Sequence, residues 1–370
     1  MTIAFDAKRA FHNFRGLGNY SRDYLRLAAQ YASENRYLLF NPKKAGRQSL
    51  PQNNCFFEVT PKGIWQIAPA LWRTFGCTSR LKELHTDIFH GLSGELPMNI
   101  HKTTVSKVVT VHDAIFLRYP ELYSATYRAL FAKKVRYACR VADVVIAISE
   151  QTRRDCIELL GAEEKKVRVM YQGCSNLFRK TVTEEEKKSV RQQYNLPHEF
   201  LLDVGAIEPR KNLKTLLEAL FMSKLDIPLV VIGGESQYAR QMKRLAASLH
   251  LKVIFLHNVP FTSLPAIYQS AHALVYPSFF EGFGIPILEA LCSNLPVLTS
   301  TGSCFAETGG DAALYADPHK TDDIAEKLRM LVFDDVLRRN MIERGTIQAA
   351  KFTDDIIGNN IHSLYQSLCK

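Results

Sequence analysis

The sequence has no long apolar run, because none of its hydrophobic stretches approaches the roughly 18 residues that a membrane-spanning helix needs. Its eight cysteines are scattered without any Cys-x-x-Cys pair, which argues against a zinc site and a disulfide framework. Residues 1–6 carry no basic stretch leading into an apolar run, so we expect no cleaved leader. These absences predict a cytoplasmic protein with reduced, mostly buried thiols and no metal.

The length and charge of the chain point to two unlike halves. At 370 residues it exceeds one ordinary hydrophobic core, so we expect two domains. The net charge of +10 is uneven: residues 1–172 hold 26 Lys and Arg against 15 Asp and Glu, whereas residues 173–370 hold 21 against 22. The basic first half suits an anionic partner such as membrane headgroups or a lipid-linked phosphate, unless its charge serves only solubility.

Short apolar strands alternate with helical stretches along both halves, which predicts an α/β fold with two parallel sheets covered on both faces. The first half is expected to hold strands at 3–6, 37–40, 55–59, 88–90, 108–111, 144–148 and 167–171, and helices at 18–33, 64–75, 120–140 and 150–160. The second is expected to hold strands at 200–204, 229–232, 253–256, 274–276, 297–299 and 313–315, and helices at 212–223, 237–249, 263–270, 286–293, 321–333, 335–349 and 353–368.

The join between the halves is expected at 172–183, before a charged helix around 184–188. We therefore predict an N-terminal Rossmann-like domain over 1–172 and a C-terminal one over 173–350, followed by a helix over 351–370 that returns to the first domain. Open α/β sheets bind ligands at the carboxyl ends of their strands. Two doubly wound domains would thus face each other across a deep cleft.

The most informative stretch is 281–289, in which Glu281 and Glu289 flank a turn with Gly282 and Gly284. Glycine permits positive φ and close approach of the backbone to a ligand. A buried strand precedes the turn and an apolar helix follows, so backbone N–H groups and the helix dipole would face an anion. Eight helical residues rise about 12 Å, which is too far for a glycosidase carboxylate pair. The two acids suit hydroxyls at two ends of a long ligand, or else they only complement the helix dipole.

A basic pair follows the strand at 200–204. Gly205 opens the loop, and Arg210 and Lys211 come just before a helix. Cations oppose the dipole at a helix N-terminus, so their presence there favours a clamp on a diphosphate. The alternative is that they are solvated loop cations.

Candidates in the first half are fewer. Gly16 and Gly18 lack the full Gly-x-Gly-x-x-Gly spacing, but they suit a flexible loop over phosphates. His112 ends a strand at the carboxyl edge, where it would hydrogen-bond a sugar hydroxyl or serve only the structure. We assign structural roles to His90 and to Ser149, the latter as a helix cap.

Together these stretches resemble the retaining glycosyltransferases of family 4, which have the GT-B fold. The resemblance spans nearly the whole chain, through residues 16–20, 87–91, 110–113, 142–150, 208–212, 276–290 and 296–297. The pair of glutamates within 281–289 is highly specific, His112-Asp113 is moderately so, and Gly16 with Gly18 is weak alone. One departure is Ala206, where many members carry Arg, and this shifts the phosphate charge onto Arg210 and Lys211.

The resemblance implies an enzyme that moves mannose or a related hexose from a nucleoside diphosphate sugar to a glycan or lipid-linked acceptor, with retention and without metal or cofactor. It implies that Glu289 binds ribose hydroxyls, that Arg210 and Lys211 neutralise the diphosphate, and that His112 lies near the transferred sugar. Glu281 and backbone amides would hold the sugar and the diphosphate. The implied donor-binding residues are Gly16, Gly18, Gly205, Gly282, Phe283, Gly284, Ile285 and Glu289.

Two other functions remain open at this point: a nucleotide-sugar epimerase, which needs no acceptor, and a nucleotide-sugar-binding protein without turnover. The helix expected at 120–140 mixes cations with aromatics, as a helix on an anionic membrane does, although a solvated helix face gives the same pattern. We therefore expect peripheral association with the inner face of the membrane. No nucleic-acid-binding motif is present, so we expect no nucleic acid partner.

Overall fold

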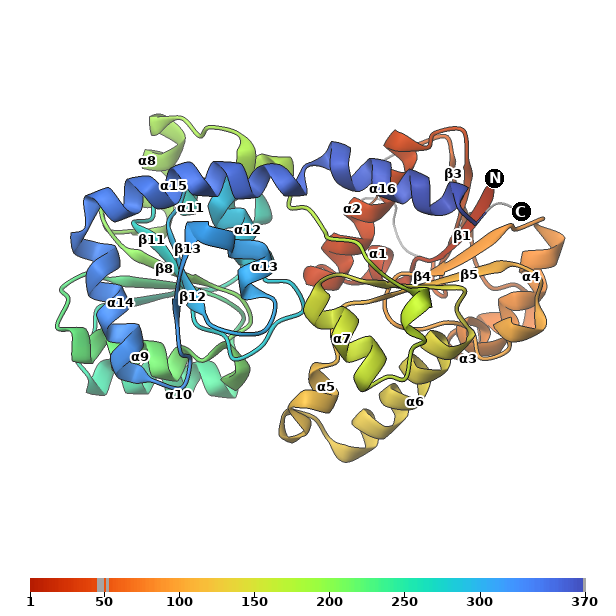
Figure 1. Cartoon of the computed structure of the whole chain (residues 1–370), viewed down its shortest axis with the longest axis horizontal. Coiled ribbons are helices and arrows are strands. Elements are labelled where there is room, and N and C mark those ends of the chain that lie inside the picture. Colours follow the sequence, from red (N-terminus) through yellow and green to blue (C-terminus); the bar gives the residue numbers. More distant parts are fainter. Residues whose placement is uncertain (45–49, 51–52, 369–370) are drawn as a thin grey trace. The chain divides into compact units, whose positions relative to one another are not determined.

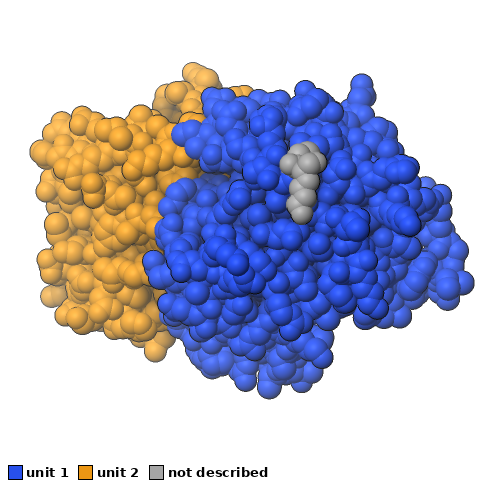
Figure 2. Space-filling model, turned by 45° about the vertical axis from the view of Figure 1, so that its right-hand side comes forward, with its two compact units in different colours: residues 1–172, 354–370 blue, residues 173–353 orange. Residues whose placement is uncertain are grey.

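The computed structural model describes residues 1–44, 50 and 53–368, and these form two compact units, each built on a parallel sheet (Figure 1). The first unit comprises Met1–Gln172 and Asp354–Lys370, and the second comprises Gly173–Thr353 (Figure 2). Within the described residues, no helix is both long enough and apolar enough to cross a bilayer.

The sheet of the first unit has seven strands in the order β3-β2-β1-β4-β5-β6-β7, so the direction of winding reverses between β1 and β4. All its strand pairs are parallel. Its inner strands are buried apolar runs such as Ile3–Phe5, as expected for a sheet covered on both faces. The strands are β1 (Thr2–Asp6), β2 (Arg36–Phe40), β3 (Phe56–Val59), β4 (Ile88–Gly91), β5 (Ser106–Val111), β6 (Val144–Ala147) and β7 (Val167–Val169).

Helices cover both faces of this sheet and enclose two apolar clusters. The C-terminal helix α16 packs against α2, where Tyr31 donates a hydrogen bond to Asp355 and Arg26 pairs with Asp354 at 2.9 Å (Figure 1). The helices are α1 (Lys8–His12), α2 (Gly16–Tyr31), α3 (Pro69–Leu71), α4 (Thr78–Glu83), α5 (Ile115–Arg118), α6 (Ala125–Val141), α7 (Glu150–Glu158) and α16 (Asp354–Gln366).

The sheet of the second unit has six parallel strands in the order β10-β9-β8-β11-β12-β13, with its reversal between β8 and β11. Its strands are β8 (Leu201–Val204), β9 (Leu229–Ile232), β10 (Val253–Leu256), β11 (Ala273–Tyr276), β12 (Val297–Ser300) and β13 (Ala313–Ala316). Its helices are α8 (Glu184–Tyr194), α9 (Leu213–Ser223), α10 (Gln237–Ser248), α11 (Leu264–Tyr268), α12 (Ile285–Cys292), α13 (Phe305–Gly309), α14 (Thr321–Phe333) and α15 (Asp335–Ala349).

The strands expected from the sequence are all present, with ends that differ by at most two residues. The single helix expected at 64–75 is wrong. That segment is a 3-10 turn at Gly63–Gln66, the short α3, and a π-helical turn at Trp72–Gly76. Pro69 fits the first turn of a helix but not its interior, so it interrupts a continuous helix at this point.

Candidate functional site

The two motifs of the second half meet at one end of the second sheet. Gly205 directly follows β8, and residues 277–284 directly follow the neighbouring strand β11. Ligands of open parallel sheets bind outside the carboxyl ends of the strands, at the point where the strand order reverses. The topology therefore brings both motifs to the expected ligand-binding position.

The loop after β8 has a backbone that few residues other than glycine adopt. Gly205 has a φ of 151°, and a Cβ atom there would lie 3.5 Å from Nζ of Lys211. The loop ends in a 3-10 turn, after which Asn212, with a φ of 60°, directly precedes the first residue of α9. The Asn212 side-chain amide donates to the Pro277 carbonyl oxygen at 3.1 Å. This hydrogen bond ties the basic loop to the segment that follows β11.

One carboxylate holds the two cations of the basic loop. Oε1 of Glu281 lies 2.7 Å from Nη1 of Arg210 and 2.7 Å from Nζ of Lys211. Arg210 also pairs with Glu208 at 2.6 Å and donates to the Phe280 carbonyl oxygen. The sequence reading expected Glu281 to face a ligand's hydroxyls and the cations to face an anion. In the structure these three side chains also pair with one another.

The charges of this cluster govern the ionisation of Glu281. Burial raises the pKa of this carboxyl, but the positive charges of Lys211 and Arg210 outweigh burial and bring its pKa down to about 2. Glu281 is therefore ionised at neutral pH. A single buried anion fixes both cations in position, at the place where the sequence predicts a diphosphate.

The turn at 281–284 opens α12 as predicted. Gly284 has a φ of 87° and precedes the first helical residue Ile285, and no side chain caps the helix. The Ser303 hydroxyl donates to the Glu281 carbonyl oxygen at 2.9 Å, and the Glu281 N–H donates to Ser303 Oγ at 3.2 Å. The first N–H groups of a helix lack intrahelical acceptors and carry partial positive charge. The start of α12 therefore suits an anionic ligand.

Glu289 lies one turn from the end of α12 and is buried. Tyr268 donates to its Oε2 at 2.8 Å. Burial raises the pKa of Glu289 to about 7, against the opposing effect of this hydrogen bond. The two glutamates of the motif thus differ in ionisation, because the neighbouring cations lower the pKa of Glu281 whereas burial raises that of Glu289.

Three residues at this site were missed by the sequence reading. Tyr276 ends β11, and Nζ of Lys211 contacts its hydroxyl and lies 4.7 Å from its ring centre. Asp203 is buried in β8, where burial raises its pKa to about 7 against the charge of Lys211. A carboxylate inside an otherwise apolar strand was a readable signal for Asp203. No signal in the sequence pointed to Ser303, because only the fold brings this residue to Glu281.

His112 directly follows β5 in the first unit. Its Nε2 donates to the Leu92 carbonyl oxygen at 2.9 Å, and its ring meets that of Tyr20 edge to face at 4.5 Å. Burial lowers the pKa of His112 to about 4, so the ring is neutral at pH 7. Because Nε2 carries the proton, Nδ1 is an acceptor, which suits a hydroxyl group better than an anion.

The glycines near the N-terminus do not form the loop that the sequence predicted. Gly16 and Gly18 lie in the first turn of α2, which begins two residues earlier than expected. A Cβ atom on Gly18 would lie 1.6 Å from the Asn13 carbonyl oxygen, whereas one on Gly16 would meet nothing within 4 Å. Gly18 is therefore required by close packing of the helix against the preceding turn.

Two structural roles predicted for the first unit, those of His90 and Ser149, are confirmed. His90 is buried, with hydrogen bonds of 2.7 Å to Tyr365 and 2.8 Å to Thr110, and Ser149 caps α7. The seven cysteines within the described residues are free thiols, and Cys369 lies outside those residues. Across the same residues, no group of three or more His, Cys, Asp or Glu side chains could hold a metal ion.

The basic helix predicted at 120–140 is α6, and its exposed face is smaller than expected. Tyr137 is buried, Lys134 pairs with Glu95 at 3.2 Å, and Arg136 donates to the Leu159 carbonyl oxygen. Tyr127 and Leu130, near its N-terminal end, are exposed. The aromatic and basic pattern in the sequence therefore reaches the surface only in part, because half of the helix packs on the sheet.

Comparison with known proteins agrees with the fold and the motifs. Residues 27–175 match the family described as Glycosyltransferase Family 4, and residues 184–348 match the one described as Glycosyl transferases group 1. The O-antigen chain mannosyltransferase B of Escherichia coli is 29% identical over 280 residues, covering 74% of this chain and 72% of that protein. The matched part covers 57% and 34% of the next two curated relatives.

Solved structures share the whole architecture. Sucrose-phosphate synthase from Thermosynechococcus elongatus superposes with a TM-score of 0.81 at 19% identity, covering 100% of this chain and 99% of that one. HepE of Anabaena in complex with UDP-glucose does so with a TM-score of 0.78 at 18% identity, covering 99% of both chains. The fold is thus that of the GT-B class, and the family models and the curated relatives show that the enzyme is a glycosyltransferase. The chain is therefore a glycosyltransferase similar to those of family 4, with the family 4 match in its first half and the group 1 match in its second half.

Proposed function

We propose that the enzyme transfers mannose or a related hexose from a nucleoside diphosphate sugar to a hydroxyl of a glycan or lipid-linked acceptor, with retention of configuration and without a metal ion. The observation that carries the proposal is the cluster of Arg210, Lys211 and Glu281 at the strand reversal, beside the uncapped start of α12. The mannosyltransferase named among the relatives supports the choice of sugar.

The chemical difficulty of this transfer is the negative charge that develops on the leaving diphosphate. Arg210 and Lys211 would share that charge, and the N–H groups of Gly282, Phe283, Gly284 and Ile285 would add preorganised donors. One such donor is typically worth about 3–4 kcal/mol of transition-state stabilisation. This supply of positive charge removes the need for a metal ion in the proposed reaction.

The cations would arrive at the diphosphate already positioned. In the structure Glu281 holds both of them, so little rearrangement is needed when a second anion binds. The Glu281 carboxylate would then also accept hydrogen bonds from sugar hydroxyls. Glu289 would accept hydrogen bonds from the ribose, and neutral His112 would accept one from a hydroxyl of the transferred sugar through Nδ1.

The proposed step breaks the bond between the anomeric carbon and the diphosphate oxygen. The acceptor oxygen forms its bond to that carbon on the same face, and its proton passes to the departing phosphate. This scheme follows the family resemblance, and it requires no enzymic nucleophile. The first unit would bind the acceptor and the second the donor.

An anionic membrane surface is a proposed partner of the first unit. This unit carries the positive excess of the chain. Leu122 is exposed in the 3-10 turn before α6, and Tyr127, Leu130 and Lys133 are exposed in the N-terminal half of that helix. Apolar and basic side chains together favour the interface of an anionic bilayer. The first unit would bind a lipid-linked acceptor at that membrane surface.

The proposal is tested with the full-length enzyme and a panel of GDP-, UDP- and ADP-linked sugars. A ligand that binds the folded state raises its melting temperature, so the panel identifies the donor. Proton NMR of the product formed in EDTA then reports the anomeric configuration. We expect one donor to stabilise the protein and an α-linked product from an α-linked donor. Inversion, or loss of activity in EDTA, would refute the corresponding part of the proposal, and turnover of donor without acceptor would indicate epimerisation.

A further inference from the structure

Two cysteine side chains meet at the end of α12 in the second unit. Cys292 is the last residue of α12, and Cys174 is the second residue of the unit, which the chain enters at Gly173. The Cys174 thiol donates a hydrogen bond to Cys292, and the two Sγ atoms lie 3.3 Å apart. Because the two residues are 118 positions apart in the sequence, only the fold brings these sulfur atoms together.

Neighbouring contacts hold the two sulfur atoms side by side. The 3-10 turn Asn176–Arg179, which begins two residues after Cys174, packs against α12. The hydroxyl of Ser293, the residue after Cys292, donates to the Phe178 carbonyl oxygen at 3.4 Å. The segment that carries Cys174 is thus fixed to the end of the helix that carries Cys292.

Cys292 has the properties of a reactive thiol. It is partly exposed, whereas Cys174 is buried. The hydrogen bond from Cys174 lowers the pKa of the Cys292 thiol, and the charge of Arg179 acts in the same direction, against burial and the charge of Glu289. Oxidants react with the thiolate form, and redox-sensing cysteines combine a low pKa and solvent access with a second cysteine beside them. Cys292 with Cys174 meets all three conditions.

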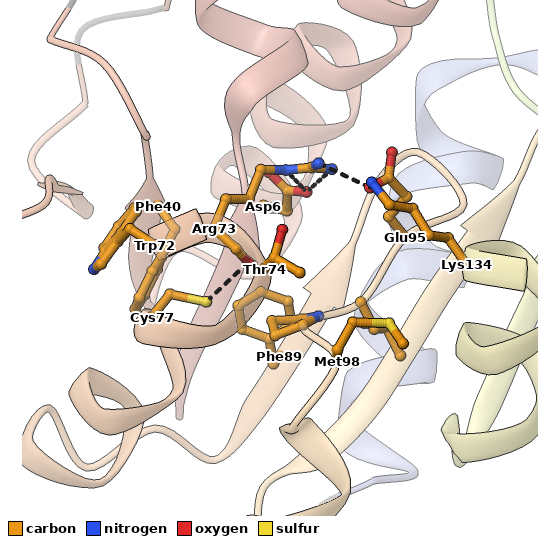
Figure 3. Close-up of a pocket in the computed structure, with 12 residues that line it drawn as sticks. Asp6, Phe40, Trp72, Arg73, Thr74, Cys77, Phe89, Glu95, Met98 and Lys134 are labelled. Atoms are coloured by element: carbon orange, nitrogen blue, oxygen red, sulfur yellow. Dashed lines mark hydrogen bonds and ion pairs between the residues drawn. The ribbon is translucent and has the colours of Figure 1, made fainter. Parts of the chain in front are cut away.

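The other thiols in the described part of the chain lack this combination. Cys77 is buried, its Sγ donates to the Arg73 carbonyl oxygen at 3.4 Å (Figure 3), and burial raises its pKa to about 12. Such a thiol acts as a small apolar side chain. Cys55 is the one described cysteine besides Cys292 that is not buried, and burial of its sulfur still raises its pKa. Cys292 is therefore the described thiol best suited to oxidation.

We propose that Cys292 and Cys174 form an oxidant-sensitive modification site, in which a hydroperoxide oxidises Cys292 and Cys174 then closes a disulfide with it. The Cys292 thiolate attacks the peroxide, so that an S–O bond forms, the O–O bond breaks and hydroxide leaves. The Cys174 sulfur next attacks the sulfur of this sulfenic acid, so that an S–S bond forms and the S–O bond breaks. The departing hydroxide takes the Cys174 proton. Overall, two thiols are oxidised and one hydrogen peroxide is reduced to two water molecules.

The disulfide would also change the position of α12. A disulfide holds its sulfur atoms about 2.0 Å apart, so the two segments must approach by about 1.3 Å from the present 3.3 Å. The same helix begins at the anion-facing turn and carries Glu289 one turn before Cys292. Displacement of positioning groups by about 1 Å can slow a reaction about 100-fold. We therefore expect oxidation to slow sugar transfer about tenfold or more, an expectation that rests on the proposed function.

A second pair of cysteines in the chain provides a matched control. Cys156 also has a thiol beside it, that of Cys139, but both side chains are fully buried. Cys156→Ser and Cys292→Ser therefore each remove one thiol from a pair, and only the second removes the partly exposed sulfur. Cys174→Ser keeps that sulfur and removes the partner that would close the disulfide.

The experiment treats the full-length enzyme with hydrogen peroxide and measures its intact mass, followed by peptide mapping without reductant. We expect the wild type and Cys156→Ser to lose two hydrogen atoms, with the peptides of Cys174 and Cys292 linked, and dithiothreitol to restore them. Cys292→Ser should show no such loss. Cys174→Ser should keep a sulfenic acid on Cys292, which dimedone traps. Sugar transfer should fall on oxidation of the wild type and Cys156→Ser, but not of Cys292→Ser.

A wild type that keeps its mass, or a disulfide that joins any other two cysteines, would overturn the proposal. Fully oxidised enzyme that transfers sugar at the rate of the reduced enzyme would refute control of transfer by this pair. Melting temperatures of the reduced samples show which variants are folded, and if Cys174→Ser does not fold, Cys292→Ser and the peptide map of the wild type decide the question. The mass measurements use no nucleotide, so they stand even if no nucleotide sugar is a donor, a result that would contradict the proposed function alone.

Discussion

Replacing Glu281 by glutamine is the sharpest test of the charge cluster in the second unit. The substitution keeps the size of the side chain and removes its charge. The side chains of Glu281, Arg210 and Lys211 are only 11%, 12% and 13% exposed. Glutamine would therefore leave two poorly solvated cations without their shared counter-ion. Removing one partner of a buried ion pair typically costs about 3–5 kcal/mol.

The pKa of Glu281 gives a second value for the stability that Glu281→Gln would lose. A fall from 4.5 to about 2 corresponds to a preference for the ionised form on the order of 3 kcal/mol in the folded state. Because the folded pKa lies below the unfolded one, this contribution is complete above pH 4.5 and is lost as the pH falls through about 2. The stability deficit of Glu281→Gln should therefore be about 3 kcal/mol at pH 7 and should shrink steadily below pH 4.5.

The assay is urea unfolding of the full-length protein followed by hydrogen exchange, which reads peptides of the second unit separately. Glu208→Gln is the matched control. Glu208 also pairs with Arg210, but its side chain is 42% exposed. We expect its loss to cost about 1 kcal/mol or less, as for an exposed pair. If Glu281→Gln were as stable as the wild type at pH 7, or if its deficit were unchanged at pH 3, the assignment of a stabilising buried cluster would be refuted.

Three further predictions concern other parts of the chain. Gly18→Ala should destabilise the first unit by about 1–3 kcal/mol through overpacking against Asn13, and Gly16→Ala should be neutral or slightly stabilising in the same unfolding assay; equal effects would contradict the packing argument. Burial holds the pKa of Glu289 near 7, so this carboxyl is partly protonated at neutral pH. Nucleotide affinity measured by calorimetry should therefore rise from pH 6 to pH 8, and it should become flat in Glu289→Gln; a pH dependence that survives the substitution would exclude Glu289 as its source. The enzyme should sediment with anionic vesicles at low salt and less at high salt, and Leu130→Ser should weaken this binding. Sedimentation that does not change with salt concentration would contradict a basic membrane-binding surface.

The order of the elements was predictable because parallel sheets buried on both faces leave a strong pattern. Apolar runs such as those of β9 and β10 stand out between polar helices, and their ends were predicted to the residue. Short helices such as α1 and α13 were missed, because they have too few turns to show a periodic pattern. The interruption at Pro69 was also missed, although proline itself was the readable signal.

Within the candidate site, the sequence revealed which residues gather but not how they pair. The spacing of Glu281 and Glu289 and the position of Arg210 and Lys211 predicted a shared location at one sheet edge. The mutual neutralisation of Glu281 with the two cations depends on side-chain directions that only the folded loop defines. Likewise, the sequence did not reveal that Gly18 is needed for close packing against Asn13, because only the folded turn brings that carbonyl to the helix.

The central claim is that the basic loop stabilises charge on a departing diphosphate, and transfer rates of two lysine variants test it most directly. Lys211→Ala removes a cation of the cluster, whereas Lys214→Ala removes one of equal charge that is exposed on α9 and pairs only loosely with Glu218 at 3.6 Å. Measured with the donor found by the ligand panel, kcat/KM should fall about 100- to 1,000-fold for Lys211→Ala and stay unchanged for Lys214→Ala. Folded Lys211→Ala enzyme that transfers sugar as fast as the wild type would contradict the account.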